Sequence, residues 1–163
     1  MFGYALDGKA SMAVELIVAP YRAGEDAIAL VQYTRQAAIQ FDGGSQPALI
    51  VVLEIAGAGM SHMTMHALGE ATFKHPEPPL VALVTENETA HRLIRALPWF
   101  GVTNVTAVGT FEEAVRWVER ARGENLLPHF SELLEEARRM AEEAPSTPAD
   151  DPSRGVPPRG PHP

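Results

Sequence analysis

Two histidines in the middle of the chain stand at a spacing that could bind a metal ion. His62 and His66 are four residues apart, so they would share one face of a helix, as in a helical two-histidine zinc site. Three neighbouring methionines, soft ligands that suit copper, could add to them: Met60, Met63 and Met65. Glu70 continues the same face, but no cysteine or well-placed carboxylate completes the site. We therefore favour a half-exposed helix whose methionines pack against a sheet, and we expect no metal and no cofactor.

Two hydroxyl side chains in the same segment are candidate phosphoacceptors. Ser61 and Thr64 open the predicted helix, where backbone N–H groups and the helix dipole favour negative charge. The simpler interpretation, which we prefer, makes Ser61 the helix N-cap and Thr64 a surface residue. The sequence leaves both interpretations open.

Glu54 interrupts the most apolar stretch of the chain, Ala48 to Gly59. A buried carboxylate must be paired or protonated, so it could mark a functional site. Its place near the end of a strand favours the alternative, in which it reaches solvent or an arginine. Gly57 and Gly59 follow as a lone Gly-x-Gly, without the third glycine of a dinucleotide fingerprint. With no Ser-His-Asp arrangement or nucleophile elbow either, we expect a protein that is not an enzyme.

Composition narrows the class of protein. The chain has 163 residues, of which 45% are hydrophobic and 21% charged, as in an ordinary globular domain. The net charge of −8 argues against binding to nucleic acid or to an anionic membrane surface. There is no cysteine, no apparent secretory signal and no apolar stretch long enough to cross a bilayer. We expect a cytoplasmic protein.

The elements that must position these residues are clearest between Leu80 and Glu119, which read as strand, helix, strand and helix. Leu80 to Val84 is a continuous apolar run, typical of a strand covered on both faces. Thr85 to Glu88 has the form of a capping box, with Asn87 as a competing N-cap. A second box, Thr110 with Glu113, precedes the second helix. The apolar positions that recur at helical spacing in the two helices are Ala90, Leu93, Ile94 and Leu97, then Phe111, Ala114, Val115 and Val118.

The remaining chain continues the alternation of strands and helices. Met1 to Ala10 is a loose lead-in or an edge strand with a turn at Asp7-Gly8, and seven of the last nineteen residues are proline. The other expected elements are strands over Ala13 to Ala19 and Ala48 to Ile55, and helices up to Phe41, over Ser61 to Lys74 and over Pro128 to Ala144. This order predicts a small α/β domain with a mostly parallel sheet of four to five strands and helices packed against it. We assign residues 1–122 to that domain, 123–144 to an added amphipathic helix and 145–163 to a disordered tail.

Two apolar features could face either the core or a partner. Trp99 and Phe100 follow Pro98, and we expect them to pack at a helix junction; an exposed Trp99 would instead indicate a partner surface. The C-terminal helix carries an apolar stripe made of Phe130, Leu133, Leu134, Ala137 and Met140. That stripe must cover either the chain's own sheet or a second subunit in a homodimer.

Three segments between Val14 and Glu119 resemble one known family: VELIVAPYRAGEDAIALVQ, ALIVVLEIAGAGMSHMT and VALVTENETAHRLIRALPWFGVTNVTAVGTFEEAVRWV. In strand order, and in the closing strand–helix–strand–helix pattern, they are similar to a sulfate transporter and anti-sigma factor antagonist (STAS) domain and to SpoIIAA-like bacterial proteins. The regulatory members carry an Asp-Ser-Ser-Gly phosphoacceptor segment, which is absent here; Ser61 to Met65 stands in its place. Family members often have an acidic residue where this chain has Glu54.

The resemblance implies a bacterial regulatory protein that binds a protein partner such as an anti-sigma factor or a kinase. We expect the contact surface on the turn and helix start after the central strand and on the neighbouring loop, because loops beyond the strand C-termini form the usual binding crevice. Its candidate residues are Gly57, Gly59, Met60, His62, Met65, Glu86 and Glu88, with Trp99 as a further candidate. A carrier of lipid or another small apolar ligand is the alternative. A response-regulator-like enzyme is disfavoured because neither Lys9 nor Lys74 follows a late strand.

Overall fold

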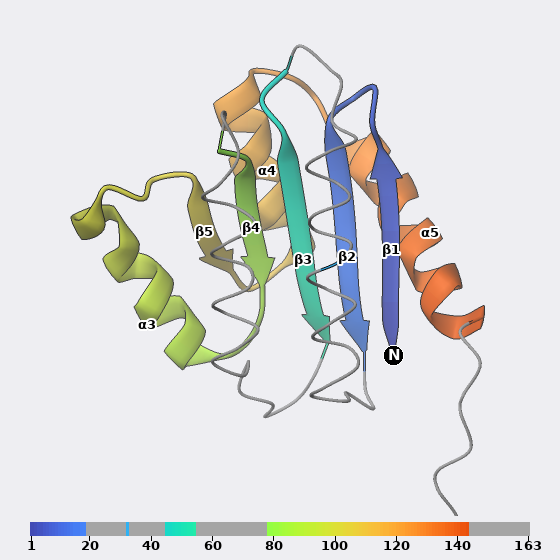
Figure 1. Cartoon of the computed structure of the whole chain (residues 1–163), viewed down its shortest axis with the longest axis horizontal. Helices are drawn as coiled ribbons and strands as arrows, with labels where there is room; N and C mark the ends of the chain where they lie inside the picture. Colours follow the sequence, from blue (N-terminus) through green and yellow to red (C-terminus); the bar gives the residue numbers. More distant parts are fainter. Residues whose placement is uncertain (19–31, 33–44, 55–77, 144–163) are drawn as a thin grey trace, which may run out of the picture.

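The computed structural model describes residues 1–18, 32, 45–54 and 78–143 (Figure 1). The helices expected up to Phe41 and over Ser61 to Lys74, and the tail at 145–163, lie outside the described residues. Within them the strands are β1 (Phe2–Asp7), β2 (Met12–Val18), β3 (Ala48–Glu54), β4 (Leu80–Val84) and β5 (Val105–Val108). The helical elements are α3 (Glu88–Ala96), the 3₁₀ turn η1 (Leu97–Phe100), α4 (Phe111–Arg122) and α5 (Leu127–Glu143).

The described strands form one sheet in the order β1-β2-β3-β4-β5. β1 runs antiparallel to β2, and β2, β3, β4 and β5 are parallel to one another. The structure thus confirms a mostly parallel sheet and an α/β fold. It also decides between the two alternatives for the first ten residues, because β1 is an edge strand that returns into β2 through a turn after Asp7.

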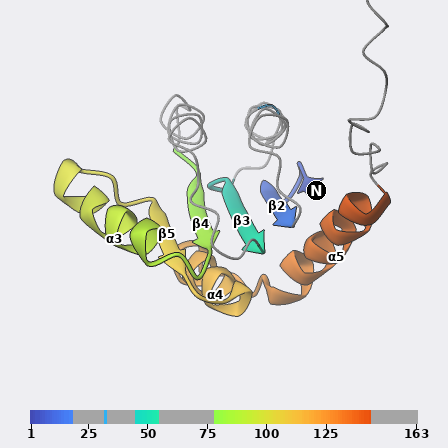
Figure 2. The same ribbon diagram turned by 90° about the horizontal axis from the view of Figure 1, so that it is seen from below.

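Alternate residues of the strands enter two separate apolar layers. Met12, Val14 and Leu16 of β2 face the layer that also contains the buried side chains of α4 and α5. Ala13 and Ile17 of the same strand face the opposite layer, which contains Ala90 and Ile94 of α3. Figure 2 shows α4 and α5 together below the strands. The apolar runs of β3 and β4, and the mostly apolar run of β2, therefore follow from burial on both faces of the sheet.

Local capping interactions set the helix ends. Thr110 and Glu113 form the expected capping box at the start of α4, and Gly123 ends that helix with φ 71°. At the start of α3, however, Asn87 is the N-cap, and its side chain accepts hydrogen bonds from the backbone N–H groups of Thr89 and Ala90. The box expected from Thr85 is not formed, because the Thr85 hydroxyl accepts the N–H of Asn87 instead, at 3.1 Å.

α5 covers the chain's own sheet. Phe130, Leu133 and Ala137 are buried against β1 and β2, in the apolar layer shared with α4. The helix differs from expectation at Met140, which is 37% exposed, and Ala141 is buried in its place. The stripe that suggested a homodimer is thus already covered within one chain.

Gly3 allows α5 to approach β1 this closely. A Cβ atom added to Gly3 would lie 1.8 Å from the carbonyl oxygen of Ala137, far inside van der Waals contact. The neighbouring atom belongs to the helix backbone, so a side chain at Gly3 cannot be accommodated by a rotamer change. The absence of a Cβ at this position is therefore a requirement of the packing between β1 and α5.

We expect Gly3→Ala to lower the free energy of unfolding by about 3 kcal/mol, because α5 must move away from β1. Urea unfolding measured by circular dichroism would give the change. Gly109→Ala is the matched control, since its Cβ would meet only Glu113 Oε2 at 3.7 Å, and it should change stability by less than about 0.5 kcal/mol. Equal changes in stability for the two substitutions would contradict the close approach of α5 to β1 at Gly3.

Candidate partner-binding surface

The described residues include three of the predicted partner-binding candidates: Glu86, Glu88 and Trp99. The other candidates of this surface lie outside the described residues: Gly57, Gly59, Met60, His62 and Met65, and with them the possible phosphoacceptors Ser61 and Thr64. His66 and Glu70 of the possible metal site also lie outside. Among the described residues, the candidate surface consists of the loop after β4, helix α3, strand β5 and helix α4.

The loop after β4 is held by hydrogen bonds to its backbone. Thr85 is 5% exposed, and its N–H donates to the carbonyl oxygen of Val108 in β5 at 3.0 Å. His91 Nε2 lies 2.8 Å from the Thr85 carbonyl oxygen. Because a carbonyl oxygen only accepts, Nε2 must carry the hydrogen. These contacts join the end of β4, the first turns of α3 and the end of β5 into one unit.

Glu86 and Glu88 both lie on the surface of this loop and helix start. Glu88 pairs with Arg92 one turn later, at 2.8 Å, with both side chains largely exposed. An exposed pair at this spacing contributes only a few tenths of a kcal/mol to stability, roughly 0.3–0.5, so a partner's charges could displace it at little cost. The two residues are accessible, as a partner contact requires.

Trp99 and Phe100 lie on the surface, not in a helix junction. They are 89% and 79% exposed on η1, and Leu93 of α3 is 55% exposed. The prediction that the two aromatic residues pack in the core is wrong, because the 3₁₀ turn that begins at Leu97 ends at Gly101 with φ 82° and directs them outward. Large apolar side chains exposed together in a short segment are typical of surfaces that bind another protein.

A groove of about 810 Å³ runs along β5 between α3 and α4. We call it the β5 groove; its walls carry His91 and Arg95 from α3 and Arg116, Trp117 and Arg120 from α4, and residues 106–109 form its floor. Two carboxylates also line it, but both are bonded to backbone N–H groups. Glu113 accepts from Gly109 and Thr110 at 3.1 and 3.2 Å. Glu119 accepts from Leu126 and Leu127 at 2.8 and 3.0 Å, capping the start of α5.

The arginines of the β5 groove are not neutralised in this way. Within residues 1–18, 45–54 and 78–143, none of Arg95, Arg116 and Arg120 pairs with a carboxylate. Among the described residues, Arg116 and Arg120 donate only from Nε, to the carbonyl oxygens of Glu112 and Arg116. Their terminal guanidinium nitrogens are therefore available, in a chain whose net charge is −8. Neither the charge nor the location of this groove was predicted from the sequence, because its arginines come from two helices that the fold brings to the same strand.

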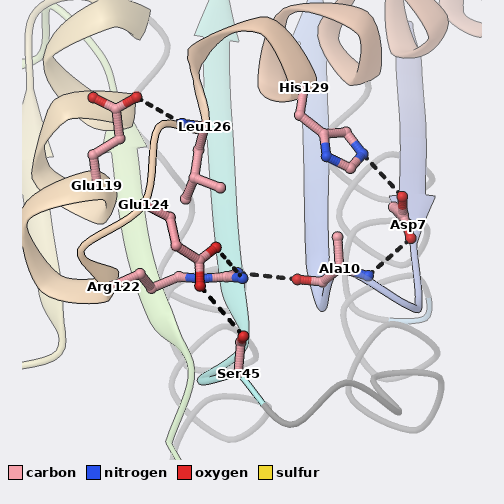
Figure 3. Close-up of polar contacts among 8 residues, drawn as sticks. All are labelled: Asp7, Ala10, Ser45, Glu119, Arg122, Glu124, Leu126 and His129. Carbon is pink, nitrogen blue, oxygen red and sulfur yellow. Dashed lines mark hydrogen bonds and ion pairs between the residues drawn. The ribbon is translucent and has the colours of Figure 1, made fainter.

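A second polar cluster lies at the β1–β2 turn, near the start of α5 (Figure 3). Arg122, whose side chain is 4% exposed, donates to the Ala10 carbonyl oxygen at 3.0 Å and pairs with Glu124 at 3.0 Å. His129 Nε2 contacts Asp7 Oδ2 at 2.9 Å. These residues fasten the junction between α4 and α5 to the β1–β2 turn, so the cluster stabilises the fold.

Glu15 is the buried carboxyl residue that the sequence analysis missed. It is fully buried in the middle of β2, opposite Tyr4 of β1 and Val51 of β3. Glu54, which seemed the anomalous residue, forms a two-point ion pair with Arg138 of α5, with its side chain 36% exposed. The interpretation that Glu54 reaches an arginine is confirmed. The sequence did contain a signal for the burial of Glu15. In a strand, residues 13, 15 and 17 point to the same face, so Glu15 shares a face with the apolar residues Ala13 and Ile17.

No family model matches the chain, and neither a curated protein nor a solved structure is significantly similar to it. Among the described helices, none combines the length and the apolar character needed to cross a membrane. The same part of the chain holds no group of three or more His, Asp or Glu side chains arranged to bind a metal ion.

We expect Glu15→Ala to destabilise the protein by about 3 kcal/mol, because truncation of this fully buried side chain leaves a cavity beside β2. Glu54→Ala is the matched control, and it should cost less than about 1 kcal/mol because the pair with Arg138 is partly solvated. Chemical denaturation of the two variants would test this. A larger loss of stability in Glu54→Ala than in Glu15→Ala would contradict the conclusion that Glu15 is the more deeply buried carboxyl residue.

Stability should also depend on the ionisation of Asp7. The Ala10 N–H, which donates to Oδ1 at 2.9 Å, holds the pKa of this carboxyl below its ordinary value of 3.8. Partial burial opposes that shift, and the His129 contact adds to it. Because the folded-state pKa is depressed, the stabilisation is present above the unfolded-state pKa and is lost as the pH falls through the folded-state value.

Asp7→Asn should therefore lower the free energy of unfolding at pH 7 by about 1 kcal/mol, after allowance for solvent screening at this partly exposed site. The difference from wild type should persist at pH 5 and shrink below the ordinary carboxyl pKa. Urea unfolding at pH 7, 5, 4 and 3 measures it. A difference in the free energy of unfolding that grows toward acid pH would contradict a lowered pKa of Asp7 in the folded state.

Proposed function

We propose that this chain is a non-enzymatic regulatory protein that acts by binding another protein. The exposed pair Trp99 and Phe100 is the observation that carries the proposal. Apolar side chains of this size normally leave water during folding, and burying one is worth roughly 1.5–3 kcal/mol. Tryptophan is also among the residues that contribute most to binding energy at protein interfaces.

The accessible loop beside α3 supports the same conclusion. Glu86 and Glu88 follow the carboxyl end of β4. In parallel sheets, binding surfaces usually form beyond the carboxyl ends of the strands. His91 holds that loop through the Thr85 carbonyl, so the surface is fixed before a partner arrives. A pre-formed surface loses less conformational entropy on binding than a flexible one.

The resemblance of three segments to STAS domains narrows the proposal to an anti-sigma factor antagonist-like role in the bacterial cytoplasm. The mostly parallel sheet, with helices against its faces, was expected from the alternation of strands and helices, and it agrees with the strand order on which this resemblance rests. The Asp-Ser-Ser-Gly segment is absent, so the proposed role does not require phosphorylation at that position. An anti-sigma factor, a kinase or another regulator is the proposed class of partner.

The test is a native pull-down from the source cell with wild type and the double variant Trp99→Ser/Phe100→Ser. We expect the recovered partner to fall at least tenfold in the variant, because removal of a central tryptophan commonly costs 2 kcal/mol or more, or about thirtyfold in affinity. Met140→Ser is the matched control, since Met140 is an exposed apolar residue on α5. Mass spectrometry identifies the partner.

A parallel pull-down with Ser61→Ala/Thr64→Ala separates a constitutive binding protein from a phosphorylation switch. Retention of the partner, with no phosphate on either residue, would agree with constitutive binding. Unchanged recovery in the Trp99→Ser/Phe100→Ser variant would overturn the proposed surface. Copurification of lipid with no protein partner would favour a carrier over a regulator.

A further inference from the structure

The β5 groove has two helices as its walls and one strand as its floor. α3 lies alongside β5, and its buried face packs with Val105 and Ala107 (Figure 1). α4 packs on the face of the sheet that carries Val108. The groove between these helices measures about 810 Å³, and pockets that bind small ligands commonly measure roughly 300–1,000 Å³. It can therefore receive several side chains of a bound partner.

Positive charge predominates in the groove. Arg95 of α3 and Arg116 and Arg120 of α4 line it, and none of them pairs with a carboxylate among the described residues. The carboxylates of Glu113 and Glu119 also line it, and they accept N–H groups at the starts of α4 and α5. A helix start carries roughly half a positive charge, which offsets part of the charge of each carboxylate. Three guanidiniums thus lie near two partly neutralised carboxylates.

Trp117 gives the groove an apolar wall beside these arginines. Its side chain lines the groove and packs against the apolar layer under α4, so only part of it is exposed. Arginine binds carboxylates through charge-assisted, often paired hydrogen bonds. Tryptophan offers a large apolar surface that commonly contributes much of the binding energy at an interface. A ligand that matches both kinds of group carries acidic side chains around an apolar one.

We propose that the β5 groove binds an acidic segment of the partner protein, in which aspartate or glutamate residues flank an apolar residue. The carboxylates pair with Arg95, Arg116 and Arg120, and the apolar side chain packs on Trp117. This proposal rests on the proposed function, and it names the chemistry by which the partner is recognised.

The groove is close to the exposed aromatic pair. Arg95 is in the last turn of α3, and η1, which carries Trp99 and Phe100, follows that helix directly. One partner can therefore contact the aromatic pair and place acidic side chains in the groove. Because the two contacts differ in chemistry, each can be removed without the other.

Two occupants from this chain itself fit the groove less well. Residues 145–163 contain two aspartates and two arginines, so they do not form an acidic segment. A second copy would present the outer side of α5, where Arg139 lies one turn from Glu135 and from Glu143. Each copy also has a net charge of −8, and like net charges oppose association.

NMR tests the position of the bound segment. The probe is an N-acetylated, C-amidated heptapeptide with leucine at its centre and glutamate elsewhere, compared with the same peptide containing lysine in place of glutamate. Each of the two tryptophans in the chain gives its own indole N–H signal. We expect the glutamate peptide to shift the signal of Trp117 further than that of Trp99. The lysine peptide should bind about tenfold more weakly, or less tightly still, because its ammonium groups meet the guanidiniums.

Fluorescence anisotropy with fluorescein-labelled peptide then assigns the groups that bind it. Arg95→Gln/Arg116→Gln should weaken binding of the glutamate peptide about tenfold or more, because two charge-assisted contacts are lost. Lys9→Gln/Arg139→Gln is the matched control, since it makes the same change in net charge outside the groove. It should weaken binding less than about threefold, because distant exposed charges are screened by salt. Circular dichroism confirms that each variant is folded.

Equal binding of the two peptides, or equal losses in the two neutralised variants, would overturn this proposal. A shift of the Trp99 signal without one of Trp117 would overturn it as well. Sedimentation velocity tests the remaining occupant. Self-association of the wild type that Arg95→Gln/Arg116→Gln abolishes would make a second copy the occupant, against the proposal.

The pull-down, repeated with Arg95→Gln/Arg116→Gln, separates this proposal from the proposed function. We expect recovery of the partner to fall in this variant. A partner that this variant retains and Trp99→Ser/Phe100→Ser loses would leave the proposed function in place and overturn the groove as the partner's site. If the aromatic variant retains the partner and the arginine variant loses it, the β5 groove stands and the aromatic surface does not.

Discussion

Burial of β2, β3 and β4 on both faces is the constraint on which the rest of the described structure depends. Their residues are nearly all inaccessible, so each face must be covered by side chains from other elements. α4 and α5 cover one face, and Gly3 lets α5 settle onto β1 at backbone contact. A helix lies beside each edge of the sheet: α5 beside β1, and α3 beside β5 (Figures 1 and 2).

The polar side chains near β1 and those near β5 differ in their partners. Near β1, charged groups are bonded within the chain: Arg122 to a backbone carbonyl and Glu124, Asp7 to His129 and a backbone N–H. Near β5, the carboxylates are bonded to backbone N–H groups of helix starts, and the guanidiniums of three arginines remain without a carboxylate among the described residues. An acidic protein therefore carries a local positive surface in the β5 groove, because the carboxylates there cap helix starts while the three arginines pair with no described carboxylate.

The features that support the proposed function belong to the segment from β4 to α4. This segment holds the accessible loop at Glu86 and Glu88, the exposed aromatic residues at Trp99 and Phe100, and the β5 groove. Its backbone is held by the Asn87 cap and by the capping box at Thr110, so the exposed side chains project from fixed positions. A rigid frame with accessible apolar and cationic groups suits recognition of another protein.

By itself the sequence determined the elements and the class of fold. Apolar runs, helical spacing and the Thr110–Glu113 box depend on residues within a few positions of one another, so strands, helices and a mostly parallel sheet could be read from the chain. Only the tertiary structure decided that Glu15 is buried while Glu54 meets Arg138, that Trp99 is exposed, that Asn87 rather than Thr85 caps α3, and that α5 covers its own sheet. The physical reason is that burial and long-range pairing depend on neighbours far away in sequence: the Glu54–Arg138 contact joins residues 84 positions apart.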